Sequence, residues 1–178
     1  MILRLIGAAL LATVGFVLWA AMTAKDGDAL FQESSRDAKT SEVAGVDETA
    51  FVTRVLDGDT IVLANGEKVR YIGIDAPELY GSEDAAECFA AEALAKNRDL
   101  VLNKEVRLEK DTSDTDKYGR LLRYVYLGDE FVNVQLVSEG FAYAASYYPD
   151  TAKDKALAEA ERDAQENGRG LWEAGTCE

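Results

Sequence analysis

Five charged residues carry the chemistry that this sequence suggests: Arg70, Asp75 and Glu78 close together, Asp59 before them and Arg120 after them. Arg70 lies in an apolar run typical of a β-strand, and the two acids follow where a proline turns the chain. Carboxylates can bind a hard cation, and guanidinium groups can bind a phosphate. The sequence contains no His, so catalysis has to use carboxylates, Lys, Tyr, Arg or a metal ion held by oxygen.

Each of these residues has an ordinary explanation by itself, as a turn acid or a surface cation, and only their convergence indicates a site. Asp59 and Asp75 lie at the matching ends of a hairpin predicted over residues 60–74, so we expect them to be close, with a bulge or curl absorbing the offset. Two carboxylates without His or Cys select Ca²⁺ or Mg²⁺. We expect a polar, mobile loop over residues 110–119 to bring Arg120 over this site. A metal ion, two arginines and the spare carboxylate of Glu78 are the parts that phosphodiester hydrolysis needs.

The elements that must position these residues are five short strands and three helices. Alternation and turn signals predict strands over 51–56, 60–63, 67–74, 104–109 and 120–127, with Asn65-Gly66 as a hairpin turn. Helical periodicity predicts helices over 86–102, 131–139 and 151–167, and Gly140 and Gly168 would end the last two. We expect the segment 141–148 to be extended and 170–172 to pack back onto the body. The predicted fold is α+β, a five-stranded OB-fold β-barrel with three helices, preceded by an N-terminal hydrophobic membrane-targeting helix.

The 178 residues divide into three predicted parts. Residues 1–24 hold a long apolar run after Arg4 and form either a signal peptide or an N-terminal membrane anchor, so we expect the remainder to be exported. Residues 25–49 are acidic and lack apolar periodicity, which is typical of a disordered linker. Residues 50–178 would form the folded domain. The net charge of −14 argues against binding nucleic acid through bulk charge.

Five motifs give the chain a resemblance to the staphylococcal (micrococcal) nuclease family. They are V-L-D-G-D-T at 55–60, R-Y-I-G-I-D-A-P-E at 70–78, D-K-Y-G-R at 116–120, V-N-V-Q-L-V-S-E-G-F-A at 132–142 and G-L-W at 170–172. They occur in the family's order and near its spacing, and the resemblance covers residues 50–172. It implies a Ca²⁺-dependent exported endonuclease that hydrolyses phosphodiester bonds of DNA and RNA, with single strands preferred. Nothing in the sequence suggests an obligate interface, so we expect a monomer.

The resemblance also implies a role for each site residue. Asp59 and Asp75 would bind Ca²⁺ through their carboxylates, and Ala76 would bind it through its backbone carbonyl. Arg70 and Arg120 would stabilise the phosphoryl group, and Glu78 would activate or orient water. Three further residues would contact the substrate: Lys117, Tyr118 and Tyr148. The alignment over 143–149 is ambiguous by one residue, which makes Tyr147 the alternative for the role of Tyr148.

Three departures from the family pattern stand out. Ala76 replaces a frequent Thr, which matters little if only its carbonyl binds metal. Ser146 stands where a nucleotide-contacting Tyr is expected, which would weaken substrate affinity. The chain is acidic where the well-known family member is basic.

The two cysteines, Cys88 and Cys177, form an even pair in a protein expected to be exported, so we predict a disulfide between them. The chain-entropy model gives such a long loop about 4 kcal/mol of stabilisation. A catalytic thiol is a poorer explanation, because no His could activate it.

Two other functions remain open from the sequence. The chain could be a catalytically silent OB-fold module that binds nucleic acid or a protein, but Arg70, Glu78 and Arg120 would then have no task. It could instead be a membrane-tethered Ca²⁺-binding domain, which needs only Asp59 and Asp75.

Overall fold

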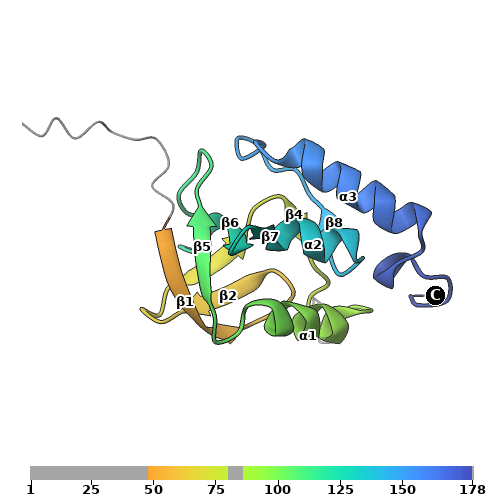
Figure 1. Ribbon diagram of the computed structural model, residues 1–178, viewed down its shortest axis with the longest axis horizontal. Helices are drawn as coiled ribbons and strands as arrows, with labels where there is room; N and C mark the ends of the chain where they lie inside the picture. The colour runs from red at the N-terminus through yellow and green to blue at the C-terminus, as the bar shows by residue number, and fades with distance from the viewer. Residues whose placement is uncertain (1–47, 80–85, 178) are drawn as a thin grey trace, which may run out of the picture. The chain divides into compact units, whose positions relative to one another are not determined.

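The computed structural model describes residues 48–79 and 86–177 (Figure 1). The predicted apolar segment, residues 1–24, and the linker up to residue 47 lie outside the described residues. The first strand begins at Glu48, so the last two residues of the segment predicted as linker belong to the folded domain. Within the described residues, no helix is both long and apolar enough to cross a membrane.

A closed barrel of five strands forms the centre of the domain. Its strands are β1 (Glu48–Val55), β2 (Thr60–Leu63), β3 (Lys68–Tyr71), β5 (Glu105–Glu109) and β6 (Leu121–Leu127). Strands β3, β2, β1, β5 and β6 are neighbours in that order, and a parallel pairing of β3 with β6 closes the barrel. Closure leaves these strands without a free edge. The prediction of a five-stranded barrel with three helices is therefore confirmed.

The predicted third strand, residues 67–74, is two strands in the structure. Gly73 has a φ of +77°, a value that L residues rarely adopt, and it separates β3 from β4 (Ile74–Asp75). β4 leaves the barrel and pairs with β8 (Tyr143–Ala144). This break is the predicted irregularity between Asp59 and Asp75.

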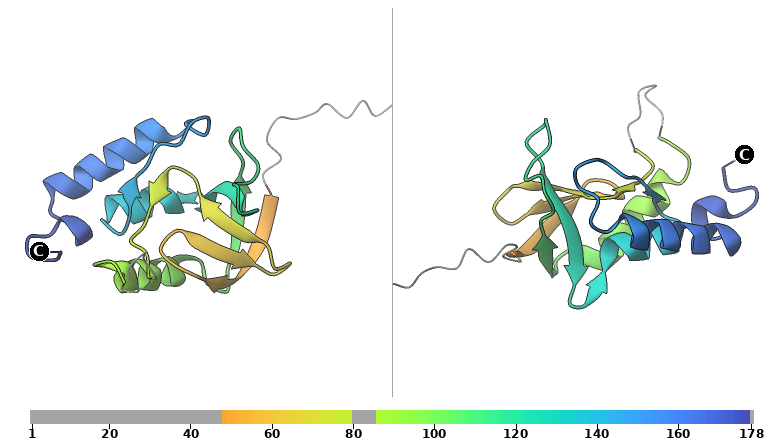
Figure 2. Two further views of the ribbon diagram at one scale, coloured as in Figure 1. Left: turned by 180° about the vertical axis from the view of Figure 1, so that it is seen from behind. Right: turned by 90° about the horizontal axis from the view of Figure 1, so that it is seen from above.

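The described residues form three α-helices, α1 (Ala90–Val101), α2 (Val132–Ser138) and α3 (Asp154–Glu166). α1 and α2 pack against the barrel, and α3 packs against α2 and β8 (Figure 2). Each is shorter than predicted. The prediction started α1 at residue 86, but Phe89 adopts a left-handed φ of +70° directly before the helix, so Cys88 precedes α1. A short strand β7 (Glu130–Phe131), which the sequence analysis missed, occupies the start of the predicted second helix.

The glycine stops and the C-terminal packing follow the sequence. Gly140 and Gly168 have positive φ directly after α2 and α3, as predicted. Leu171 in the 3₁₀ turn η1 (Gly170–Trp172) is buried, and its N–H donates to the carbonyl of Gly140 at 2.9 Å. Cys88 and Cys177 form the predicted disulfide, which ties the C-terminus to the segment before α1.

Candidate active site

Arg70 is the centre of a cluster of charges at the end of β3. Its Nη1 lies 2.6 Å from Oδ2 of Asp59, and its Nη2 lies 2.6 Å from Oδ1 of Asp75. Nη1 also donates to the carbonyl of Ile74 at 3.0 Å. The turn at Gly73 makes this possible, because it directs the chain back so that Asp75 reaches the guanidinium of a residue five positions earlier. The expected convergence of Asp59 and Asp75 is therefore confirmed.

Asp59 is the buried member of the cluster, with 1% of its surface exposed. The N–H of Ala76 donates to its Oδ2 at 2.7 Å, and the hydroxyl of Thr60 donates to its Oδ1 at 3.1 Å. Burial raises the pKa of Asp59 well above its ordinary value, and the guanidinium of Arg70 opposes this shift. A cation bound beside this carboxyl would favour its charged form, as Arg70 does.

Asp57 and Asn97 support this turn, and neither was assigned a role from the sequence. Oδ1 of Asp57 accepts the N–H of Asp59 at 3.0 Å, which fixes the Asp-Gly-Asp turn. Asn97 of α1 is fully buried; its amide donates to the carbonyl of Asp57 at 3.0 Å, and its oxygen accepts the hydroxyl of Tyr71 at 3.0 Å. Asn97 lies alone on the apolar face of the predicted helix, and this pattern could have indicated such a contact, because a buried amide needs hydrogen-bond partners.

Glu78 lies in the electrostatic field of the same cluster. Partial burial raises its pKa, the carboxylates of Asp57, Asp75 and Glu87 raise it further, and Arg70 opposes them. The N–H of Glu78 donates to Oε2 of Glu87 at 3.0 Å, and the N–H of Glu87 donates to the carbonyl of Glu78 at 2.9 Å. These bonds tie Glu78 to the segment that the disulfide anchors.

Arg120 is held by Asp116, four residues earlier. Oδ2 of Asp116 accepts Nε of Arg120 at 2.6 Å, and its Oδ1 accepts the N–H groups of Arg120 and Tyr118 at 3.0 and 2.8 Å. Burial raises the pKa of the Asp116 carboxyl, but these hydrogen bonds outweigh burial and hold that pKa below its ordinary value. The sequence placed Asp116 in a motif but gave it no task.

The loop over residues 110–119, predicted to be mobile, is anchored at several points in the structure. The N–H of Ser113 donates to Oδ1 of Asp150 at 2.6 Å, and Thr115 forms an isolated bridge with Leu121. The loop therefore reaches the site as a formed turn.

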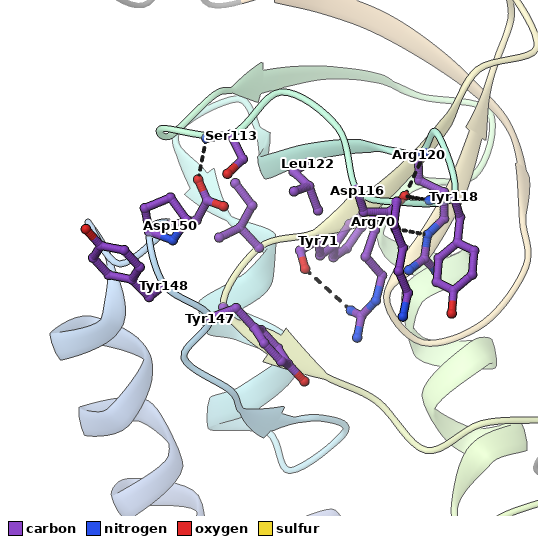
Figure 3. Close-up of a pocket in the computed structure, with 14 residues that line it drawn as sticks. Arg70, Tyr71, Ser113, Asp116, Tyr118, Arg120, Leu122, Tyr147, Tyr148 and Asp150 are labelled. Carbon is purple, nitrogen blue, oxygen red and sulfur yellow. Dashed lines mark hydrogen bonds and ion pairs between the residues drawn. The ribbon is translucent and has the colours of Figure 1, made fainter.

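A cleft of about 600 Å³ lies between this loop and the segment before α3. Arg70, Arg120 and Tyr118 lie at one end of the cleft, and Tyr148 and Asp150 lie at the other (Figure 3). The cleft is lined by residues 70–73, Ser113, residues 116–118, Arg120, Leu122 and residues 147–150.

Three tyrosines lie at the cleft with exposed side chains. Tyr118 is 72% exposed, Tyr147 57% and Tyr148 92%, and Lys117 places its ammonium 5.0 Å from the ring centre of Tyr118. Tyr147 extends toward the guanidinium of Arg70, while Tyr148 points away from it (Figure 3). The structure therefore brings Lys117, Tyr118 and Tyr147 close to the arginines, and Tyr148 lies farther from them.

The oxygen donors beside Arg70 have the chemistry that a hard cation prefers. Two carboxylates, Asp59 and Asp75, share one guanidinium, and the backbone of Ala76 adjoins both. No group of three or more His, Cys, Asp or Glu side chains in the described residues is arranged to hold a metal ion. Asp59 and Asp75 supply two carboxylates of the kind that a hard cation binds, and both pair with Arg70.

Comparisons with known proteins agree with this architecture. The family model described as "Staphylococcal nuclease homologue" matches residues 68–174. The chain belongs to the staphylococcal nuclease family. It is 39% identical over 152 residues to a thermonuclease of Staphylococcus intermedius, across 83% of this chain and 86% of that protein.

Two more relatives of the family bear similar names. The chain is 34% identical over 146 residues to a thermonuclease of Staphylococcus hyicus, across 80% of this chain and 86% of that protein. It is 37% identical over 124 residues to the endonuclease YncB of Bacillus subtilis, across 67% of this chain and 59% of that protein.

Proposed function

We propose that this member of the staphylococcal nuclease family is a phosphodiesterase, a Ca²⁺-dependent exported endonuclease that hydrolyses DNA and RNA and prefers single strands. The observation that carries the proposal is that Arg70 and Arg120 line one cleft while Arg70 also joins Asp59 and Asp75. Two guanidinium groups beside an open cleft can bind the oxygens of one phosphodiester group. The names of the relatives, thermonuclease and endonuclease, support the same reaction class.

Each residue has a task in this mechanism. Arg70 and Arg120 bind the non-bridging oxygens and stabilise the charge that grows on them as water attacks phosphorus. Glu78 accepts a proton from that water or orients it; its raised pKa makes it a better proton acceptor than an ordinary Glu. Asp116 orients Arg120 through the hydrogen bond to Nε.

Asp59, Asp75 and the carbonyl of Ala76 would hold Ca²⁺ in this proposal. When bound there, the cation would supply Lewis-acid stabilisation of the phosphoryl oxygens and would offset the acidic field of the chain. Lys117 and Tyr118 would contact a neighbouring phosphate, and the exposed tyrosines at the cleft would contact nucleobases. Tyr147 suits this contact better than Tyr148, because it extends toward Arg70. Without base pairing, a single strand exposes its bases to such contacts, which would favour single-stranded substrates.

The direct test follows cleavage of single-stranded DNA and RNA at low salt in Ca²⁺, in Mg²⁺ and in EDTA. We expect cleavage in Ca²⁺ and none in EDTA. Arg70→Ala and Arg120→Ala should each lower kcat by about 10²–10³ or more, as expected for the loss of one oxyanion-binding group. Lys155→Ala, an exposed cation on α3, is the matched control and should cleave at the wild-type rate. Near-wild-type turnover in both arginine variants would refute these roles.

Binding without cleavage in any metal would instead favour the silent OB-fold module.

The predicted membrane-targeting segment, residues 1–24, is tested separately. Sequencing the N-terminus of the protein recovered from its native host distinguishes a cleaved signal peptide from a retained anchor. A monomer is expected, and light scattering of the purified protein tests it.

A further inference from the structure

Two further cationic side chains, those of Lys68 and Arg54, lie on the same outer face of the sheet as Arg70. Lys68 is two residues before Arg70 in β3, so both side chains project from the outer face of the barrel. Val62 of β2 is the register partner of Lys68 on one side and of Arg54 in β1 on the other. Arg54 and Lys68 therefore lie on one face across β2, about 10 Å apart by the spacing of neighbouring strands.

A β-bulge places Arg54 on this outer face. Val52 points into the barrel and is fully buried, so simple alternation would direct Arg54 inward as well. The register of β1 against β2 shifts between Val52 and Arg54, which inserts Thr53 as an extra residue. As a result Thr53 and Arg54 are both exposed, and Val55 packs against the core instead.

This face is continuous with the cleft. β3 and β6 run parallel, with Val69 beside Leu121 and Arg70 beside Leu122. Arg120 directly precedes β6, at the level of Lys68 one residue before Val69. Arg54, Lys68 and Arg120 therefore follow one another across β1, β3 and the start of β6.

The charge of Arg54 and Lys68 is not neutralised within the fold. No carboxylate in the described residues 48–79 and 86–177 forms an ion pair with either side chain. By contrast, Arg70 pairs with two carboxylates, and Arg120 and Arg123 pair with one each. Both are exposed, in a chain whose net charge is −14. Uncompensated cations on an acidic protein attract a polyanion locally, and a phosphate can bind them without first displacing a carboxylate.

An exposed aromatic ring on the same strand favours nucleic acid over an acidic protein as the occupant. Phe51 of β1 is 46% exposed, three residues before Arg54, on the side opposite to the buried Val52. Cationic side chains with an exposed aromatic ring are the combination by which sheets bind single-stranded nucleic acid, since bases stack on the ring and phosphates contact the cations.

We propose that Arg54 and Lys68 bind phosphates of the polynucleotide strand that continues beyond the cleft, so that the substrate site extends over the outer face of β1–β3. This inference rests on the proposed nuclease function and adds the path of the substrate to it. Short substrates that fill only the cleft do not reach these cations, whereas longer strands do.

The test measures binding in EDTA, so that it does not depend on cleavage. The full chain is titrated against fluorescein-labelled dT12 and dT3 at several salt concentrations, and fluorescence anisotropy gives Kd. Each single-strand phosphate contact contributes about 0.7 to the slope of log K against log salt. The R54Q/K68Q variant should therefore lose about 1.4 from the slope for dT12, which corresponds to about 25-fold weaker binding at 0.1 M salt. Its Kd for dT3 should stay at the wild-type value.

The matched control is K155Q/R162Q, which removes the same charge from exposed positions of α3 on another side of the domain (Figure 1). It should leave the slope for dT12 unchanged. The single variants R54Q and K68Q should each lose about half of the effect, which keeps the test valid if the double variant folds poorly.

An unchanged slope for dT12 in R54Q/K68Q would overturn the inference, and so would an equal loss for dT3 or for the control. Cleavage of single-stranded DNA by wild type and variants is measured separately. If wild type cleaves in Ca²⁺ but the slope does not change, the nuclease proposal stands and only the extended site fails. If wild type cleaves nothing, the nuclease proposal fails, and the change in slope still decides whether this face binds the strand.

Discussion

Replacing Arg70 should destabilise the metal-free protein as well as remove activity. Arg70→Ala leaves the carboxylate of Asp59, 1% exposed, without its ion-pair partner at 2.6 Å. Two hydrogen bonds remain, from the N–H of Ala76 at 2.7 Å and from the hydroxyl of Thr60 at 3.1 Å. These bonds only partly compensate for a charge that is shielded from water.

At pH 8.5 the expected loss is about 3 kcal/mol in the free energy of unfolding, the lower end of the range for breaking a buried ion pair. The lower end applies because the two hydrogen bonds persist. Since single domains are stable by about 5–15 kcal/mol, this loss is large enough to measure by denaturation.

The loss should depend on pH with a definite sign. Burial raises the pKa of Asp59, and removing Arg70 raises it further, because the guanidinium opposes the shift. In Arg70→Ala, protonation of Asp59 stabilises the folded state, and this contribution is fully present below the unfolded-state pKa of about 3.9. The contribution is lost as the pH rises through the raised pKa that Asp59 has in the folded state. The difference between variant and wild type should therefore be larger at pH 8.5 than at pH 5.5.

Urea titrations in EDTA, followed by circular dichroism at both pH values, measure this effect. Lys68→Ala, an exposed cation two residues away on the same strand, should change stability by less than about 0.5 kcal/mol. The D59N/R70A double variant should be more stable than R70A, because neither group is then buried as an unpaired charge. Equal midpoints for R70A and wild type at pH 8.5 would refute the reasoning.

Three further predictions follow from contacts around the site. Reduction of the Cys88–Cys177 disulfide, which joins residues 89 apart, should lower the free energy of unfolding by about 4–5 kcal/mol in the chain-entropy model. Urea titration with and without dithiothreitol measures this loss, and the C88S/C177S variant should not respond to the reductant. Gly58→Ala would place a Cβ 2.5 Å from that of Ala76 and 2.9 Å from that of Ala93, so it should destabilise by about 1–3 kcal/mol in thermal unfolding; an unchanged melting temperature would contradict the packing. Asp116→Ala should lower kcat by about 10–100-fold through misplacement of Arg120, with normal circular dichroism, and partial rescue in Asp116→Asn would support a positioning role.

The sequence by itself predicted the five barrel strands, the three helices and the convergence of Asp59 and Asp75. Asn65-Gly66 predicted the hairpin, and the glycines after α2 and α3 predicted where these helices end, because both signals act through local backbone geometry. The spacing of Asp59 and Asp75 about that hairpin predicted their convergence, since antiparallel strands place their far ends together.

Only the tertiary structure decided how these residues are held. Local patterns did not indicate that Gly73 would split the third strand, that Asn97 of α1 would support the Asp57 turn, or that Asp116 would orient Arg120. Alternation would even have directed Arg54 into the barrel, and the register shift against β2 places it on the surface. Such features depend on contacts between segments far apart in the chain, where burial and strand register set the outcome and local propensity does not.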